Sequence, residues 1–245
     1  MSNSKTLRGI LIALLGFALT VSAADSKKPS RLNKLSEAQK QKGWKLLFNG
    51  KDLTGWRAYD AKGKIGPGWE VKDGILIKKQ GVSGGNIMTV KKYKDFDLNW
   101  QWKIGPAGNS GIKYMITEER GKAIGHEYQM LDDEGWAAKG HKIAPKGSCA
   151  SFYDVLPPRE NKRMRKPGEW NHSRIFVKSG VVEHWLNGRK VLSYRLGSEE
   201  TLAGVMNSKF KKVEGFGKEL PNGGHILLTD HKDECHFKNI RIREF

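Results

Sequence analysis

The sequence predicts an all-β protein built as an antiparallel β-sandwich. Short apolar segments follow one another between turns, and the 245 residues include 29 Gly and 8 Trp but only 8 Pro. Several segments alternate apolar and polar residues with the period of a strand. Strands without regular intervening helices argue against an α/β fold.

The first 24 residues have the pattern of a signal peptide. Lys5 and Arg8 precede an apolar run from Gly9 to Val21, and small residues follow at 22–24. A membrane anchor is the alternative, but the run is shorter than the roughly 20 apolar residues that a span needs. We therefore expect cleavage, a periplasmic or secreted protein, and no stable membrane span.

Residues 25–43 are predicted to form a linker and a short helix. Ser36 and Gln39 have the spacing of a capping box, and Gly43 supplies a stop. Residues 44–245 then form one expected β-sandwich domain, because no internal repeat or proline-rich linker divides them.

The most regular strand pattern lies at residues 95–104, where large apolar side chains alternate with polar ones. One face of this strand is therefore expected in the core and the other in water. A second helix is expected at 198–210, and the phase slip between Phe237 and Ile240 predicts a β-bulge. Further strands are expected at 44–48, 71–77, 87–90, 111–117, 126–131, 174–178, 181–186, 190–194, 225–229 and 236–242.

The charge balance is strongly basic, with 44 Lys and Arg against 26 Asp and Glu, a net charge of +18. The basic run from Arg159 to Lys166 makes nucleic acid a partner to consider. No known RNA- or DNA-binding motif accompanies this run, and export opposes such a partner. We interpret the run as a solvated loop that could steer an anionic glycan, and we expect no nucleic acid partner.

Two cysteines, Cys149 and Cys235, occur in the chain. An oxidising compartment would permit them to pair. Two buried free thiols are the alternative, and the sequence does not decide between them.

The most informative segment for function is 125–133. Several enzyme classes are disfavoured, because the sequence has no phosphate-binding loop, no metalloprotease motif and no nucleophile elbow. In a strand, Glu127 and Gln129 lie on one face, and Tyr128 and Met130 on the other, core-facing side. A carboxylate beside an amide can bind sugar hydroxyls, hold a metal or act as a base. A solvated strand face is the alternative.

A second segment repeats this pattern. Asn109 and Lys113 have the phase opposite to the apolar residues Ile112 and Tyr114. If the two strands are neighbours, their polar side chains form a polar floor, which consists of Asn109, Lys113, Glu127 and Gln129. Tryptophans at the rim of such a sheet face can stack on sugar rings.

Three further residues are candidates for the site. His231 follows an apolar strand, where it could titrate near neutrality and transfer a proton, or could be an ordinary surface histidine. Trp170 and Asn171 precede the late strands and could supply a stacking ring with a polar neighbour. A structural role for Trp170 is the alternative.

Several motifs, taken in chain order, resemble the DUF1080 domain family, which is associated with 3-keto-glycoside lyase/hydratase and 3-keto-disaccharide hydrolase activity. They span nearly the whole expected domain. At Thr229 and Lys232 the sequence departs from the Gln and Gly that family members often have. The motifs are GWKLLFNGKDLTGW at 43–56, YKDF at 93–96, NSG at 109–111, EYQMLD at 127–132, GEWN at 168–171, LNG at 186–188 and FKNIRI at 237–242.

This resemblance implies a concanavalin A-like jelly roll, usually exported, that acts on sugars already oxidised at C3 by a separate sugar 3-dehydrogenase. A C3 ketone acidifies the C2 hydrogen, so a base can form an enolate that expels the C1 substituent. Water can then add to the 2-hydroxy-3-keto-glucal, which gives net hydrolysis. The pair of catalytic carboxylates used by ordinary glycosidases is not required.

The candidate base and acid are Glu127 and His231, in either order. No cofactor is required, although a divalent metal ion could bind to carboxylate and imidazole groups. The alternative function is a non-catalytic glycan-binding module on the same sandwich. Candidate substrate-binding residues are Asn109, Lys113, Gln129, Asp132, Trp170 and Asn171. Candidate metal ligands are Glu127, His126, Asp132 and His231.

Overall fold

The computed structural model describes residue 1, residues 32–60 and residues 63–245. The predicted signal peptide and most of the linker lie outside the described residues, so their roles stay predictions. The described residues from Leu32 onward belong to one compact unit. No helix in this part of the chain is both long and apolar enough to cross a membrane.

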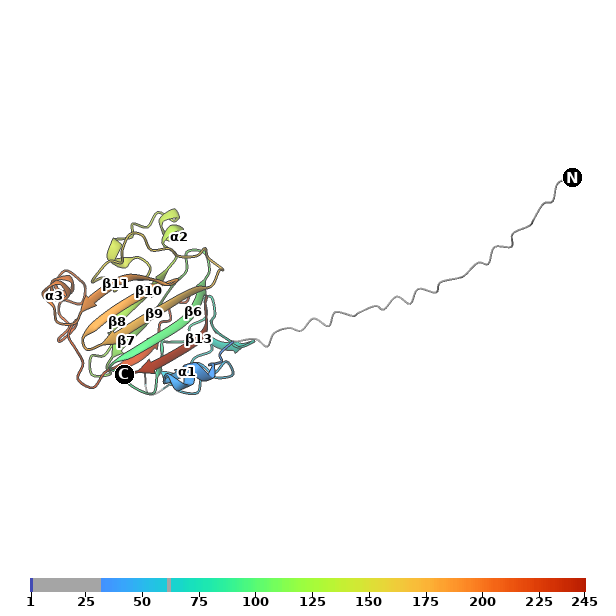
Figure 1. Cartoon of the computed structure of the whole chain (residues 1–245). Coiled ribbons are helices and arrows are strands. Elements are labelled where there is room, and N and C mark those ends of the chain that lie inside the picture. Colours follow the sequence, from blue (N-terminus) through green and yellow to red (C-terminus); the bar gives the residue numbers. More distant parts are fainter. Residues whose placement is uncertain (2–31, 61–62) are drawn as a thin grey trace. The chain divides into compact units, whose positions relative to one another are not determined.

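The domain is a sandwich of two antiparallel sheets, and Figure 1 shows the large sheet in front of β7 and β8. The larger sheet has the order β11-β10-β9-β6-β13-β4-β3, with β1 beside β13. The smaller sheet has the order β2-β5-β12-β7-β8. The strands of the larger sheet are β1 (Trp44–Leu46), β3 (Trp69–Lys72), β4 (Ile75–Lys78), β6 (Phe96–Ile104), β9 (Asn171–Lys178), β10 (Val181–Leu186), β11 (Arg189–Arg195) and β13 (Cys235–Glu244). Those of the smaller sheet are β2 (Trp56–Ala58), β5 (Ile87–Thr89), β7 (Asn109–Ile116), β8 (His126–Leu131) and β12 (His225–Leu228). The predicted all-β jelly-roll sandwich is confirmed.

Three α-helices, α1 (Glu37–Gln41), α2 (Asp133–Ala138) and α3 (Glu199–Met206), and a 3₁₀ turn at Pro145–Gly147 lie among the described residues. The capping box of Ser36 and Gln39 is present at α1, and Ser198 caps α3, as the sequence predicted. Helix α2 was not predicted, and it lies beside the candidate site.

The expected strand at 71–77 is wrong, because the chain turns within it. Asp73 and Gly74 have φ angles of 50° and 75° and form a tight turn between β3 and β4. An Asp-Gly pair is a strong hairpin signal, since both residues tolerate the left-handed conformation. The bulge predicted in β13 is confirmed by a shift of register between Lys238 and Arg241.

The core lies between the two sheets and is rich in aromatic rings. Trp100 of β6 packs edge-on against Tyr128 of β8, with ring centroids 5.0 Å apart. The opposite face of β6 is less wet than predicted, because Asp97 is buried. Arg174 binds both oxygens of Asp97, at 2.6 and 3.0 Å, and Arg243 adds a third contact at 3.2 Å.

A chain of hydrogen bonds connects two buried histidines through the core. His184 Nδ1 lies 3.0 Å from the Ala150 carbonyl, which can only accept, so Nδ1 carries the proton. His184 Nε2 then accepts from Tyr114, Tyr114 accepts from Tyr194, and Tyr194 accepts from His126 Nδ1. One carbonyl therefore orients every proton in the network when both histidines are neutral.

Cys149 and Cys235 are separate buried thiols. Burial raises the pKa of Cys149 to about 12, and it also raises the pKa of Cys235. Of the two alternatives that the sequence left open, the structure has the free thiols.

The buried histidines predict a loss of stability in mild acid. Burial lowers the pKa of His126 to about 3 and that of His184 to about 4. From these two residues alone, the unfolded chain, with histidine pKa values near 6.5, binds about two more protons than the folded chain between pH 5.5 and 4.5. In this range, the free energy of unfolding should fall by about 2 to 3 kcal/mol for each unit by which the pH is lowered. Each additional proton bound by the unfolded chain contributes about 1.36 kcal/mol per pH unit.

Urea unfolding at a series of pH values measures this slope. The His126→Phe variant should lose about half of the slope that the two histidines contribute. Equal slopes for His126→Phe and the unmodified protein would contradict the assignment.

Candidate functional site

The candidate site is the polar floor, which consists of Asn109 and Lys113 on β7 and Glu127 and Gln129 on β8. The strands are neighbours, and Lys113 pairs with Glu127 in the antiparallel register. Strand alternation directs these side chains away from the core, as predicted. A solvated strand face is nevertheless wrong, because Glu127 is 5% exposed and Gln129 is 4% exposed.

The burial of β8 has a local cause. Residues 150–153 run along the outer edge of this strand and continue its hydrogen bonding. The Ala150 N–H donates to the Gln129 carbonyl at 2.8 Å, and the Tyr153 N–H donates to the Glu127 carbonyl at 3.0 Å. The strand that carries the candidate base therefore has a covered edge and a fixed backbone.

Gly111 makes the space in which the Glu127 carboxylate lies. Gly111 pairs with Gln129 in the register, next to the Lys113–Glu127 pair. A Cβ atom built on Gly111 would overlap Glu127 Oε1 and crowd its Cγ and Cδ. Any larger residue at this position would displace the carboxylate, so Gly111 is a positioning residue that the sequence analysis quoted in a motif but did not assign.

A lysine and a histidine flank the Glu127 carboxylate. Lys113 Nζ lies 3.8 Å from Oε2, and His231 Nε2 lies 3.9 Å from Oε1. Opposite charges at such distances stabilise a buried carboxylate. The His231 side chain is 40% exposed and so is open to exchange of protons with solvent, whereas that of Glu127 is 6% exposed.

The loop that carries His231 is fixed by a buried ion pair. Lys78 Nζ and Asp230 Oδ1 are 2.9 Å apart, with side-chain exposures of 1% and 6%. The N–H groups of Gly84 and Gly85 donate to Asp230 Oδ2 at 2.6 and 2.8 Å. Burial alone would raise the pKa of Asp230, but the bonds from Gly84 and Lys78 lower it below its usual value.

The two departures from the family pattern lie in this same loop. Thr229 donates its N–H and its hydroxyl to the Gly111 carbonyl, at 3.1 and 3.2 Å. Lys232 has a φ of 65°, a conformation that favours glycine, and its N–H donates to Asp230 Oδ1 at 2.8 Å. The substituted residues therefore maintain the backbone path between Gly111 and His231.

An open cleft of about 350 Å³ adjoins the amide end of the floor. Gln129 Nε2 donates to Asn109 Oδ1 at 3.3 Å, and both side chains line this cleft. Trp136, His141 and Tyr153 also line the cleft. A volume of this size suits a small ligand, and the aromatic rings suit the apolar faces of a sugar.

Residues 43–243 match the family described as the 3-keto-alpha-glucoside-1,2-lyase-like domain. The chain belongs to this family. The match confirms the resemblance found in the sequence motifs and supports a carbohydrate-active hydrolase or lyase.

Individual relatives agree with this family assignment. A 3-keto-disaccharide hydrolase from Bacteroides thetaiotaomicron is 31% identical, with 92% of this chain and 86% of the relative covered. A solved structure from Parabacteroides distasonis, provisionally named a glycosyl hydrolase, is 34% identical with a TM-score of 0.77 and covers 87% of this chain and 99% of its own. A second one from that organism, also provisionally named, is 28% identical with a TM-score of 0.64, and covers 82% and 99%.

In this member of the lyase-like family, Asp132 caps helix α2 and does not line the cleft. Its Oδ2 accepts from the Ala107 N–H at 2.7 Å, and its Oδ1 accepts from the Gly135 N–H at 3.1 Å. Trp136 Nε1 donates to the Ala107 carbonyl at 2.8 Å. Asp132 therefore positions the helix that carries Trp136, and an Asp followed by the acidic residues Asp133 and Glu134 was the signal that could have revealed this cap.

The four candidate metal ligands do not converge. His126 faces the core, where it stacks on Phe152 with ring centroids 4.3 Å apart, and Asp132 is occupied as a helix cap. Glu127 and His231 are the two that lie together. Among the described residues, no group of three or more His, Cys, Asp or Glu side chains has the arrangement of a metal site.

Trp170 and Asn171 lie on the larger sheet, away from the floor. The Asn171 Oδ1 is buried and accepts from the Arg165 N–H at 3.0 Å and from Asn187 Nδ2 at 2.9 Å. The Trp170 ring lies under Lys238 Nζ, 3.8 Å from the ring centroid. Lys238 has the phase opposite to the buried Phe237, so Trp170 belongs to the outer face of that sheet.

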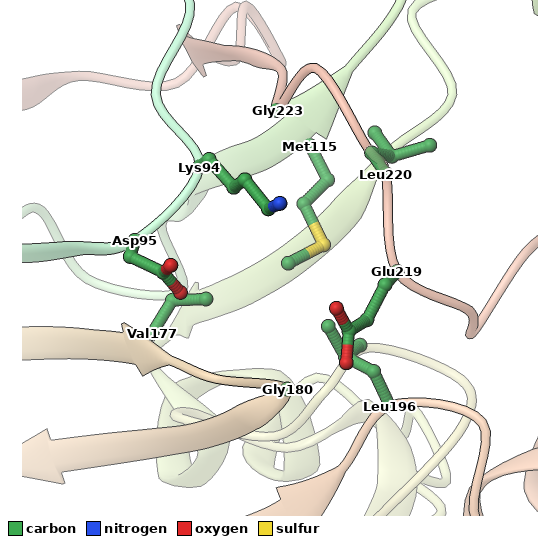
Figure 2. A pocket seen from close by; sticks show the side chains of 9 residues that line it. All are labelled: Lys94, Asp95, Met115, Val177, Gly180, Leu196, Glu219, Leu220 and Gly223. Atoms are coloured by element: carbon green, nitrogen blue, oxygen red, sulfur yellow. The ribbon is translucent and has the colours of Figure 1, made fainter.

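A second pocket near Met115 is too small for a sugar. Figure 2 shows Lys94 and Met115 pointing toward it, with Glu219 on the opposite side. Its volume of about 10 Å³ is about the space that one water molecule needs. The floor and its adjoining cleft are therefore the better site for a carbohydrate.

The buried pair predicts that the His231 loop depends on Lys78. Lys78→Met would leave Asp230 buried without its cation, which should cost on the order of 3 kcal/mol in the free energy of unfolding. Lys40→Met removes an exposed partner of Glu37 and should cost less than about 1 kcal/mol. Urea unfolding of both variants measures the difference, and equal losses would refute this role for the pair.

Proposed function

We propose that the protein cleaves 3-keto-glycosides by elimination across C1 and C2, followed by hydration of the product. The observation that carries this proposal is the buried Glu127 carboxylate, which lies between the Lys113 ammonium and the His231 imidazole. Membership of the 3-keto-alpha-glucoside-1,2-lyase-like family supports the substrate class.

In the elimination step, Glu127 acts as the base. Its carboxylate takes the C2 hydrogen, which the neighbouring C3 ketone makes acidic, and the electron pair passes into an enolate. Lys113, beside Glu127 on the floor, stabilises the negative charge that develops on the ketone oxygen. The bond from C1 to the leaving oxygen then breaks, His231 donates a proton to that oxygen, and 2-hydroxy-3-keto-glucal forms.

The hydration step uses the same groups in the reverse direction. His231, now without its proton, takes one from water, and the hydroxide adds to C1. Glu127 returns a proton to C2, which restores both residues. The sum of the two steps is hydrolysis of the glycosidic bond, and each positioned proton transfer contributes about 10²- to 10⁴-fold in rate.

The leaving sugar is assigned to the cleft beside Asn109 and Gln129. Two polar amides and the rings of Trp136 and Tyr153 line this cleft, which matches the mixed polar and apolar surface of a sugar. A separate sugar 3-dehydrogenase must supply the ketone, because an unoxidised sugar has no acidic C2 hydrogen. Export, proposed from the N-terminal pattern, would place both reactions outside the cytoplasm.

An activity assay separates this enzyme from a non-catalytic glycan-binding module. The protein should release the aglycone from a 3-keto-glucoside and leave the unoxidised glucoside intact. Glu127→Gln and His231→Ala should each lower turnover by at least about tenfold, because each removes one proton-transfer group. Glu200→Gln, which changes an exposed carboxylate on α3, should keep full activity.

Binding of the 3-keto-glucoside without release would instead favour the binding module. Full activity of both Glu127→Gln and His231→Ala would show that other residues transfer the protons. Circular dichroism of each variant shows whether its fold is retained.

The cleft assignment predicts a selective effect of Trp136→Ala. The variant should raise KM for a 3-keto-disaccharide by about tenfold, since a buried aromatic contact is worth about 1 kcal/mol or more. KM for a 3-keto-glucoside with a methyl leaving group should change much less. Equal changes for the two substrates would place the leaving sugar elsewhere.

A further inference from the structure

The outer face of the larger sheet carries another polar pocket, on the opposite side of the sandwich from Glu127. Its volume is about 230 Å³. It is lined by Gln101, His172, Asn239 and Arg241. None of these side chains takes part in the proposed cleavage.

The β13 bulge shapes this pocket. Asn239, at the bulge, has a φ of 53°, and Asn33 brackets its backbone and side chain with hydrogen bonds of 2.8 and 2.7 Å. The Asn239 Nδ2 donates to Gln101 Oε1 at 2.9 Å. Gln101 pairs with His172 on the next strand, so three strands contribute to one preformed wall.

Positively charged side chains outnumber carboxylates around the pocket. Arg174 and Arg243 share Asp97, but Arg241, Lys238 and Lys103 have no carboxylate within 4.0 Å among the described residues. Arg241 Nε is buried and has no hydrogen-bond partner in this part of the chain. The Arg241 side chain lines the pocket, so its guanidinium is the group that a bound anion would contact.

Trp170 holds the two lysines at the edge of the pocket. Lys238 Nζ lies 3.8 Å and Lys103 Nζ 5.5 Å from the centre of its ring. Burial and then the charge of Lys103 lower the pKa of Lys238. Burial and the charges of Arg241 and Arg174 likewise lower the pKa of His172, which is consistent with a positive field.

We propose that this pocket binds the carboxylate-bearing sugar residue of an anionic glycan. The Arg241 guanidinium matches a carboxylate in geometry and charge. The amides of Gln101 and Asn239 can bind the sugar hydroxyls. The volume is below that of pockets for larger ligands, so it suits one sugar residue.

The backbone of the basic run at 159–166 is joined by hydrogen bonds to the strand that supplies His172. The Arg165 N–H donates to Asn171 Oδ1, and the Arg163 carbonyl accepts from Asn187 Nδ2. Asn187 Oδ1 in turn accepts from the His172 N–H at 2.9 Å. The run is therefore tied to the strand that supplies His172, which gives its predicted role in steering an anionic glycan a place on the molecule.

Calorimetric titration of the full chain with D-glucuronate at low ionic strength tests this site. Glucuronate should bind and neutral D-glucose should not, and added salt should weaken binding. Arg241→Gln should weaken binding at least about tenfold, since a hydrogen bond to a charged group is worth about 1.5 kcal/mol or more. Lys238→Gln, in a less buried position, should weaken it in the same direction.

The matched control is Arg189→Gln, which removes the same charge from an exposed position of the same sheet and should leave binding unchanged. Glu127→Gln should also bind glucuronate normally, so this test does not depend on the cleavage chemistry. Absence of binding would overturn the proposal, as would equal weakening by Arg189→Gln. Inorganic sulfate that competes as strongly as glucuronate would also overturn it, because the pocket would then hold an adventitious ion only.

Discussion

The burial of the Glu127 carboxylate is the constraint on which the candidate site depends. A carboxylate taken out of water needs space, a neighbouring positive charge and a fixed backbone. Gly111 provides the space, Lys113 provides the charge, His231 lies beside the carboxylate, and residues 150–153 cover the strand edge. The Lys78–Asp230 pair extends this arrangement to the loop that carries His231. The chemistry proposed for the site therefore depends on contacts from several distant parts of the chain.

Alternation along β8 separates two kinds of buried polar group. His126 and Tyr128 face the core, where His126 bonds to Tyr194 and Tyr128 bonds to Ser173. Glu127 and Gln129 face the other way, toward the floor and its cleft. The same two-residue period thus lets one strand stabilise the sandwich and present the candidate base. On the larger sheet, the β13 bulge interrupts this period, and the pocket lined by Asn239 and Arg241 lies at that interruption.

The sandwich and the polar floor could be predicted because both depend on the period of a strand. The covered edge of β8 could not, since it comes from residues 150–153, which have no strand pattern of their own. Asp132 and Trp170 show a second limit. Each lies within or next to a family motif, but a motif does not show whether a side chain caps a helix or which sheet it faces. The Asp73-Gly74 turn, in contrast, was visible in the sequence as a hairpin signal.

The fate of the C2 hydrogen tests the central claim, that Glu127 acts as a base at C2, most directly. Cleavage of a 3-keto-glucoside in D₂O, followed by mass spectrometry and NMR, shows whether the sugar product gains carbon-bound deuterium. Elimination and hydration predict one deuterium at C2 of the product. The deuterium should be incorporated at the rate of cleavage. In Glu127→Gln, both cleavage and deuterium incorporation should be lost. Substrate incubated without protein corrects for spontaneous exchange beside the ketone. A cleaved product that keeps its original C2 hydrogen, with no slowing of cleavage when the substrate carries deuterium at C2, would contradict the account and indicate direct displacement at C1.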